Sequence, residues 1–235
     1  MTDEAKPKRR YNAARRRAQA EETKRAIIEA ARALFTERGY AGTTMDKIAQ
    51  RAGVAVETVY ATFHTKRAVL ARVMEVAAVG DHAPVAVLDR EGPRLVRETS
   101  DQQEQIRLFS REIREIMGRV GPVFEVMRGA APTEPEIAAL LEEYLERRRT
   151  GMAHFVQALL QNGPLRPGLT PDEATDAVWT MTSAEVYGLL TRGRSWPGER
   201  YETWLAETLA ALLLPMQPGG RHRGLLGQSN RDPSE

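Results

Sequence analysis

The residues whose types and spacing could do chemistry lie between Thr43 and Lys66, and they suit hydrogen bonding to phosphates and base edges. Hydroxyl, phenol and ammonium groups donate to phosphate oxygens, while side chains at the start of a helix in a groove reach the bases. The candidate contact residues are Thr43, Thr44, Lys47, Ala55, Val56, Glu57, Thr58, Tyr60, Thr62, His64 and Lys66. For His64, a phosphate contact and an exposed turn position are both open.

Two short helices joined by a tight turn would position these side chains. Thr43 or Thr44 supplies the cap of the first helix, and apolar residues follow at three- and four-residue spacing. Gly53 stands at the turn, because glycine adopts a positive φ without steric cost. The second helix, roughly residues 56–63, has the length to enter a major groove. The pattern therefore predicts a helix-turn-helix.

Helices on either side complete this head. An apolar stripe predicts a helix over about residues 20–38, ended by Gly39, and another over about residues 66–79 leads to the rest of the chain. Residues 1–18 are basic and almost free of apolar side chains, so we expect disorder there. This segment is either a solubilising tail or an arm that follows the phosphate backbone.

The ordered motif is specific enough to indicate a family. It comprises Gly42-Thr43-Thr44, Ile48-Ala49, Ala52-Gly53-Val54, Thr58-Val59-Tyr60, Phe63, and Lys66 with Leu70. This set resembles the DNA-binding part of TetR-family transcriptional regulators. Two positions depart from the family's habit, since Ala55 stands where serine is frequent and Thr62 where tyrosine or histidine is frequent. The resemblance implies heads that read an inverted repeat and a dimeric body that binds a small-molecule effector.

The charge distribution fits a phosphate-binding head on a larger body. Residues 1–67 hold 15 Lys and Arg against 8 Asp and Glu, a net charge of +7, whereas the remainder holds 19 against 24. Such an asymmetry is typical of a basic module that meets nucleic acid. A basic, solvated tail would also contribute to it.

The body reads as entirely helical. We expect helices over about residues 103–117, 123–128 and 136–161, with a stop at residues 118–122. Thr170, Pro171 and Glu173 form a capping box that opens a helix to about residue 192. A last helix covers about residues 199–214. The predicted fold is all-α with about nine helices, divided into a disordered arm (1–18), the DNA-binding domain (19–66), the ligand-binding and dimerisation domain (67–216) and a disordered tail (217–235).

The last two helices carry more apolar surface than one body needs. This predicts a four-helix dimer interface with two helices from each subunit; the alternative is that both helices line a large core. The interface residues would be Trp179, Thr182, Val186, Leu190, Trp204, Leu205 and Leu212.

Arg148 falls within the apolar stripe of its helix. Three interpretations are open: the side chain lies at the rim of the body with its charge in water, it pairs internally with Glu185, or it faces a ligand cavity. The candidate ligand-pocket residues are Met74, Phe109, Ile113, Met117, Phe124, Met127, Arg148, Met152, Phe155, Met181 and Glu185.

The sequence offers no catalytic constellation. It has no cysteine, Gly-rich phosphate loop or nucleophile motif, and its four histidines lack metal-ligand spacing. We therefore expect no enzyme activity, metal or cofactor.

No run of 18 apolar residues occurs, so we expect no membrane partner and a cytoplasmic location. The predicted partners are double-stranded DNA, an unknown small-molecule effector and a second copy of the chain. The alternative function is a helical protein-interaction module whose helix-turn-helix does not bind DNA.

Overall fold

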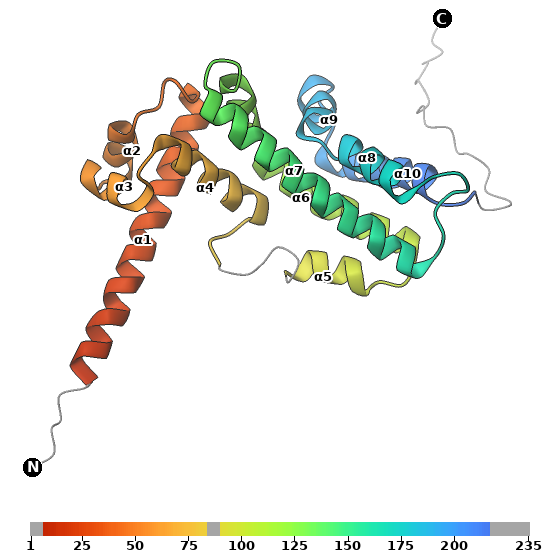
Figure 1. Ribbon diagram of the computed structural model, residues 1–235, viewed down its shortest axis with the longest axis horizontal. Coiled ribbons are helices and arrows are strands. Elements are labelled where there is room, and N and C mark those ends of the chain that lie inside the picture. Colours follow the sequence, from red (N-terminus) through yellow and green to blue (C-terminus); the bar gives the residue numbers. More distant parts are fainter. Residues whose placement is uncertain (1–6, 84–89, 217–235) are drawn as a thin grey trace, which may run out of the picture.

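The computed structural model describes residues 7–83 and 90–216, and in these ranges every regular element is a helix (Figure 1). The all-α prediction is confirmed. The helices are α1 (Pro7–Arg38), α2 (Met45–Ala52), α3 (Val56–Phe63), α4 (Lys66–Val79), α5 (Glu91–Glu98), α6 (Gln102–Ala130), α7 (Pro135–Asn162), α8 (Pro171–Met181), α9 (Ala184–Gly188), the π-helical turn η2 (Leu189–Gly193) and α10 (Gly198–Leu213).

The helix-turn-helix forms where its local signals place it. The Thr44 hydroxyl accepts a hydrogen bond from the Lys47 N–H at 3.3 Å and so caps α2. Gly53 ends α2 with φ +68°, the left-handed conformation that glycine adopts most readily. Gly42 is required for a different reason, because a Cβ there would collide with the Arg38 carbonyl. Both glycines therefore fix the path of the chain around α2.

Helix α1 is longer than the sequence pattern predicts. Disorder was expected over residues 1–18, but the structure is helical from Pro7 onward, and Figure 1 shows this end of α1 standing clear of the head. The segment is rich in alanine and arginine, which have high helix propensity, and extending a helix that is already anchored needs no new nucleus. Residues 1–6 and the predicted tail, 217–235, lie outside the described residues.

Helix α6 is also continuous where a stop was predicted at residues 118–122. Pro122 lies inside it and removes one backbone donor, which costs about 3 kcal/mol. Buried side chains continue along one face on both sides of the proline, including Met117, Val120 and Val123. Each such residue contributes about 1.5–3 kcal/mol on burial. Packing therefore outweighs the local helix breaker.

The single helix predicted over residues 170–192 is interrupted. Its capping box forms as expected, but α8 ends at Met181. Ser183 is extended, with ψ 153°, and its hydroxyl accepts from the Val186 N–H at 3.2 Å to cap α9. Serine competes in this way with the helix backbone. Residues after Thr182 therefore do not continue the helical faces of α8.

The body is built around α6, against which α4, α5, α7 and α10 pack (Figure 1). One apolar cluster runs from the head into the body through α4, whose Val73 and Met74 are buried. Because head and body share this core, the helix-turn-helix head is held firmly on α4 and α6 rather than tethered loosely.

Candidate nucleic-acid interface and ligand cavity

The predicted recognition helix α3 has one buried face and one exposed face. Val59 and Phe63 are buried in the head. Glu57 and Ala61 are exposed, and Tyr60 keeps 48% of its surface in solvent. An exposed large aromatic residue among small neighbours suits a contact with DNA. The outer face of α3 can therefore meet a groove without disturbing the core beneath it.

The other predicted residues of α3 and its flanks divide between the two faces. Ala55 is exposed and makes no side-chain cap, while Val56 is half-buried against the core. The exposed Thr62 hydroxyl donates to the Thr58 carbonyl at 2.7 Å. His64 is exposed and has φ +61°, so it is the turn residue after α3 and remains accessible.

Three residues predicted to contact phosphates make internal hydrogen bonds instead. Thr43 is fully buried, and its hydroxyl donates to the Gly39 carbonyl at 2.9 Å, so a DNA contact by its side chain is excluded. The Lys47 ammonium donates to the Gly42 carbonyl at 2.8 Å. The Lys66 ammonium donates to the Tyr40 carbonyl at 2.9 Å. These groups hold the turn between α1 and α2 together.

Tyr40 links the head to the body, a role that the sequence pattern did not reveal. Its hydroxyl donates to Glu136 at 2.8 Å, at the start of α7, and the Lys66 ammonium lies 3.9 Å from its ring centroid. Burial and the hydrogen bond to Glu136 raise the pKa of Tyr40. Burial lowers the pKa of Lys66, which the carboxylates of Glu134 and Glu136 partly oppose. Arg67 adds a hydrogen bond to the Glu136 carbonyl at 3.2 Å.

Arg148 lies at the break between α8 and α9. Its Nη2 donates to the Trp179 carbonyl at 2.5 Å and to the Thr182 hydroxyl at 2.6 Å. The Ser183 N–H bonds to the Thr180 carbonyl, so the break leaves the Trp179 carbonyl without its helical partner. Arg148 supplies that missing donor.

The internal Arg148–Glu185 pair is not formed. Glu185 is exposed, and among the described residues Arg148 has no acidic side chain within ion-pair distance. Burial lowers the pKa of Arg148, since removing a charge from water disfavours it. Of the three interpretations, the structure supports the one in which Arg148 faces a cavity.

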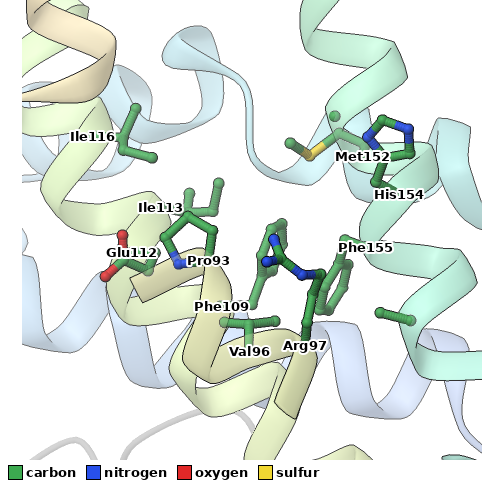
Figure 2. A pocket seen from close by; sticks show the side chains of 12 residues that line it. Pro93, Val96, Arg97, Phe109, Glu112, Ile113, Ile116, Met152, His154 and Phe155 are labelled. Carbon is green, nitrogen blue, oxygen red and sulfur yellow. The ribbon is translucent and has the colours of Figure 1, made fainter. Parts of the chain in front are cut away.

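That cavity crosses the contact between α6 and α7. One part, of about 290 Å³, lies under α4; its lining includes Met74, Met117 and Arg148. A second part, of about 140 Å³, lies under α5; its lining includes Val96, Phe109 and Phe155 (Figure 2). We name the two together the α6–α7 slot, because they share the lining residues Ile113, Ile116, Gly151 and Met152.

The slot contains most of the predicted pocket residues but not all. Met74, Phe109, Ile113, Met117, Arg148, Met152 and Phe155 line it. Phe124 and Met127 are buried elsewhere in the core, Met181 is half-buried, and Glu185 is exposed. The pattern missed Gly151, although a glycine inside a helix is a signal of close packing or open space. A Cβ at Gly151 would meet no atom within 4 Å.

The predicted dimer residues also fall into two groups. Thr182 and Leu205 are fully buried within the subunit and are not available at its surface. Partly exposed apolar side chains do remain, and they include one that the prediction did not name: Leu189 is 67% exposed. The partly exposed set is Trp179, Val186, Leu189, Leu190, Trp204 and Leu212.

With this geometry established, comparison with known proteins gives the family. Residues 27–73, which span the end of α1 through most of α4, match the family model described as bacterial regulatory proteins, tetR family. The head of the chain is therefore a TetR-family DNA-binding domain. The chain is a transcriptional regulator with a DNA-binding helix-turn-helix head.

Comparisons that cover more of the chain extend the likeness beyond the head. An uncharacterised HTH-type transcriptional regulator, YdeS, of Bacillus subtilis (strain 168) is 28% identical over 163 residues, which cover 68% of this chain and 75% of YdeS. A Mesorhizobium loti MAFF303099 protein described as a TetR-family regulator has a TM-score of 0.63 at 23% identity and covers 83% of this chain and 98% of its own.

Two further structural relatives were solved with small molecules. FadR of Bacillus subtilis, in complex with stearoyl-CoA, has a TM-score of 0.63 at 20% identity and covers 78% of this chain and 96% of its own. A transcriptional regulator from Saccharomonospora viridis, in complex with choline, has a TM-score of 0.60 at 18% identity and covers 82% and 98%. At these identities the likeness shows a shared fold.

The described part of the chain holds no group of three or more His, Cys, Asp or Glu residues that could bind a metal ion. None of its helices is both long and apolar enough to span a bilayer.

Proposed function

We propose that this protein is a homodimeric repressor that binds an inverted-repeat operator and is released when a small molecule enters the body. The observation that carries the proposal is the exposed outer face of α3, with Glu57 and Tyr60 accessible above a fully packed inner face. Glu57 stands in the first turn, the part of a recognition helix that reaches base edges. Thr44, Thr58, Thr62 and His64 remain candidates for accompanying contacts.

The basic end of α1 is proposed to contact the phosphate backbone. Arg15, Arg17 and Arg25 are exposed on α1, whose N-terminal part projects past the head (Figure 1). Lys47 and Lys66 are held by backbone carbonyls, so these arginines are better placed to supply positive charge. Phosphate contacts of this kind position a protein on DNA without reading sequence.

The partly exposed apolar set on α8 to α10 supports the dimer. Leu189 follows Val186 by three residues, so the two lie on the same side of the chain there. Leu189 is two-thirds exposed, which is unusual for a large apolar residue beside other apolar residues. A symmetric pairing of this surface would bury it twice and place two α3 helices in one assembly.

An effector is supported by the α6–α7 slot, whose lining residue Arg148 also contacts the α8–α9 break. The relatives solved with stearoyl-CoA and with choline support small-molecule binding in a body of this fold. Release from DNA requires that the effector bind the DNA-incompetent arrangement more tightly than the competent one.

The test combines sedimentation with a DNA mobility-shift assay at several salt concentrations, using operators selected from a random pool. We expect a wild-type dimer whose DNA affinity falls steeply with salt. Leu189→Glu should give a monomer that no longer shifts DNA, because the isologous interface would bury the new carboxylate twice. Thr150→Glu, which adds the same charge at an exposed position of α7, should remain a dimer. A monomeric wild type, or a salt-independent complex, would overturn the proposal in favour of a protein-interaction module.

A further inference from the structure

The walls of the α6–α7 slot are chemically uneven. Apolar side chains from α4, α5, α6 and α7 form most of its lining, with the Phe109 and Phe155 rings stacked 3.6 Å apart at one end. Figure 2 shows these two rings facing each other across the α5 end. Such a lining suits an unbranched alkyl chain, because an apolar ligand gains by leaving water and has few polar groups to satisfy there.

Positive charge predominates at the α4 end. The charged residues that line this end are Glu75, Arg147 and Arg148. Glu75 already pairs with Arg72 at 3.0 Å, and Arg147 donates to the Glu143 carbonyl at 3.3 Å. Arg148 lies deepest and has no acidic partner among the described residues. A carboxylate would thus meet two guanidinium groups and one neutralised acid.

Arg148 retains hydrogen-bonding capacity for such a carboxylate. Both of its hydrogen bonds come from Nη2, so Nε and Nη1 are without an acceptor in the described part of the chain. Each fork of a guanidinium pairs Nη2 with either Nε or Nη1, so a bidentate carboxylate would use one free donor and take one Nη2 donor from Trp179 or Thr182. Arg148 is half-buried, and an anionic ligand would offset the cost of removing part of its charge from water.

We propose that the α6–α7 slot binds an amphipathic carboxylate, with its alkyl chain along the α6–α7 crossing and its carboxylate paired with Arg148. This inference rests on the proposed effector response and names the chemical class of the effector. It also gives the route of the signal. Arg148 holds the Trp179 carbonyl and the Thr182 hydroxyl at the α8–α9 break, so a carboxylate on Arg148 competes directly with the contacts that fix the proposed dimer surface.

The test measures binding of three ten-carbon probes to the full chain: decanoate, 1-decanol and decyltrimethylammonium. Intrinsic fluorescence is the readout, because the Trp179 ring lies 5.4 Å from the Arg148 guanidinium; thermal denaturation provides a second measurement. We expect decanoate to bind about 10- to 100-fold more tightly than decanol, the range for a hydrogen bond to a charged group. Decyltrimethylammonium should bind more weakly than decanol.

Variants separate the carboxylate contact from general apolar binding. Arg148→Gln should reduce decanoate binding to the level of decanol and leave decanol unchanged. Arg149→Gln, at the next position on α7 but paired with Asp172 and Asp176 outside the slot, should bind like wild type. Gly151→Leu should fill the slot and abolish binding of both probes while Arg148 is retained. This last variant keeps the test valid if Arg148→Gln does not fold.

The inference is overturned by equal binding of decanoate and decanol, by preference for the cation, or by decanoate binding that Gly151→Leu leaves unchanged. Its failure is distinguishable from failure of the proposed function. Salt-dependent operator binding by a protein that does not bind decanoate would reject the carboxylate alone. Loss of operator binding in the wild type would reject the repressor whatever the slot binds.

Discussion

Lys66→Met tests whether the Lys66 ammonium serves the fold or the DNA. The motif alone predicts that the Lys66 ammonium contacts a phosphate, so removing the ammonium would lower the salt slope of DNA binding by about one unit. In the structure the ammonium donates to the Tyr40 carbonyl at 2.9 Å and lies 3.9 Å from the centroid of the Tyr40 ring. Methionine keeps an unbranched side chain and removes only the charge and its donors.

The magnitude follows from these two contacts. A hydrogen bond from a charged group contributes about 1.5–3 kcal/mol, and a cation–π contact about 0.5–2 kcal/mol depending on desolvation. Lys66 is half-buried, and burial of its charge opposes both contributions. We therefore expect a loss of about 2 kcal/mol in the free energy of unfolding. For a chain of this length that corresponds to a fall in Tm of about 4–8 °C.

Thermal unfolding followed by circular dichroism measures the loss of stability, and mobility shifts at several salt concentrations measure the salt slope of DNA binding. We expect Lys66→Met to lower Tm without changing the salt slope, and Lys66→Arg to recover part of the stability. An unchanged Tm together with a slope reduced by about one unit would refute the reasoning and return Lys66 to the DNA interface.

Three further predictions concern the readout, the interface and the cavity wall. Glu57→Ala should change the sequence recovered from a random operator pool while preserving nonspecific affinity, because a glutamate can accept from cytosine but not bind phosphate; an identical recovered motif would exclude Glu57 as a reader. Val186→Glu should give monomeric or insoluble protein in sedimentation, whereas a DNA-binding dimer would assign Val186 to the core. Burial, reinforced by the charge of Glu115, raises the pKa of Glu112 above 4.5, so the wild type loses stability as pH rises through that higher pKa. Glu112→Gln should therefore raise Tm at pH 7 and lose this advantage below about pH 4.5. An equal gain in Tm at both pH values would contradict this.

Local signals predicted the head well because each element there is specified within a few residues. The Thr44 cap, the Gly53 turn and the bounds of α3 depend on backbone conformation and on hydrogen bonds between near neighbours. The same is true of the capping box at Thr170. Elements of this kind can be predicted from sequence because the interactions that define them lie within the window that the pattern covers.

The errors occur where distant packing decides. Pro122 predicts a stop, yet apolar burial on both sides keeps α6 continuous. Ser183 is predicted as an ordinary helical position, yet the helix is interrupted there. Arg148, 34 residues before Thr182, donates hydrogen bonds to the groups at this interruption. Thr43 and Lys66 carry phosphate-binding chemistry, but neighbouring carbonyls capture their donors. A one-dimensional pattern shows which groups can bond but not which partner reaches them first.

The hydrogen bond between Tyr40 and Glu136 bears on how portable this DNA-binding head is. A chimeric regulator joined after Val79 would carry Tyr40, Lys66 and Arg67 with the head but would leave Glu136 behind with the old body. The grafted head would then present the Tyr40 hydroxyl, without its acceptor, to whatever side chain begins the recipient's corresponding helix. Successful exchange between regulators should accordingly depend on one acceptor at that position, and supplying a glutamate there is the change that would let a foreign body take this head.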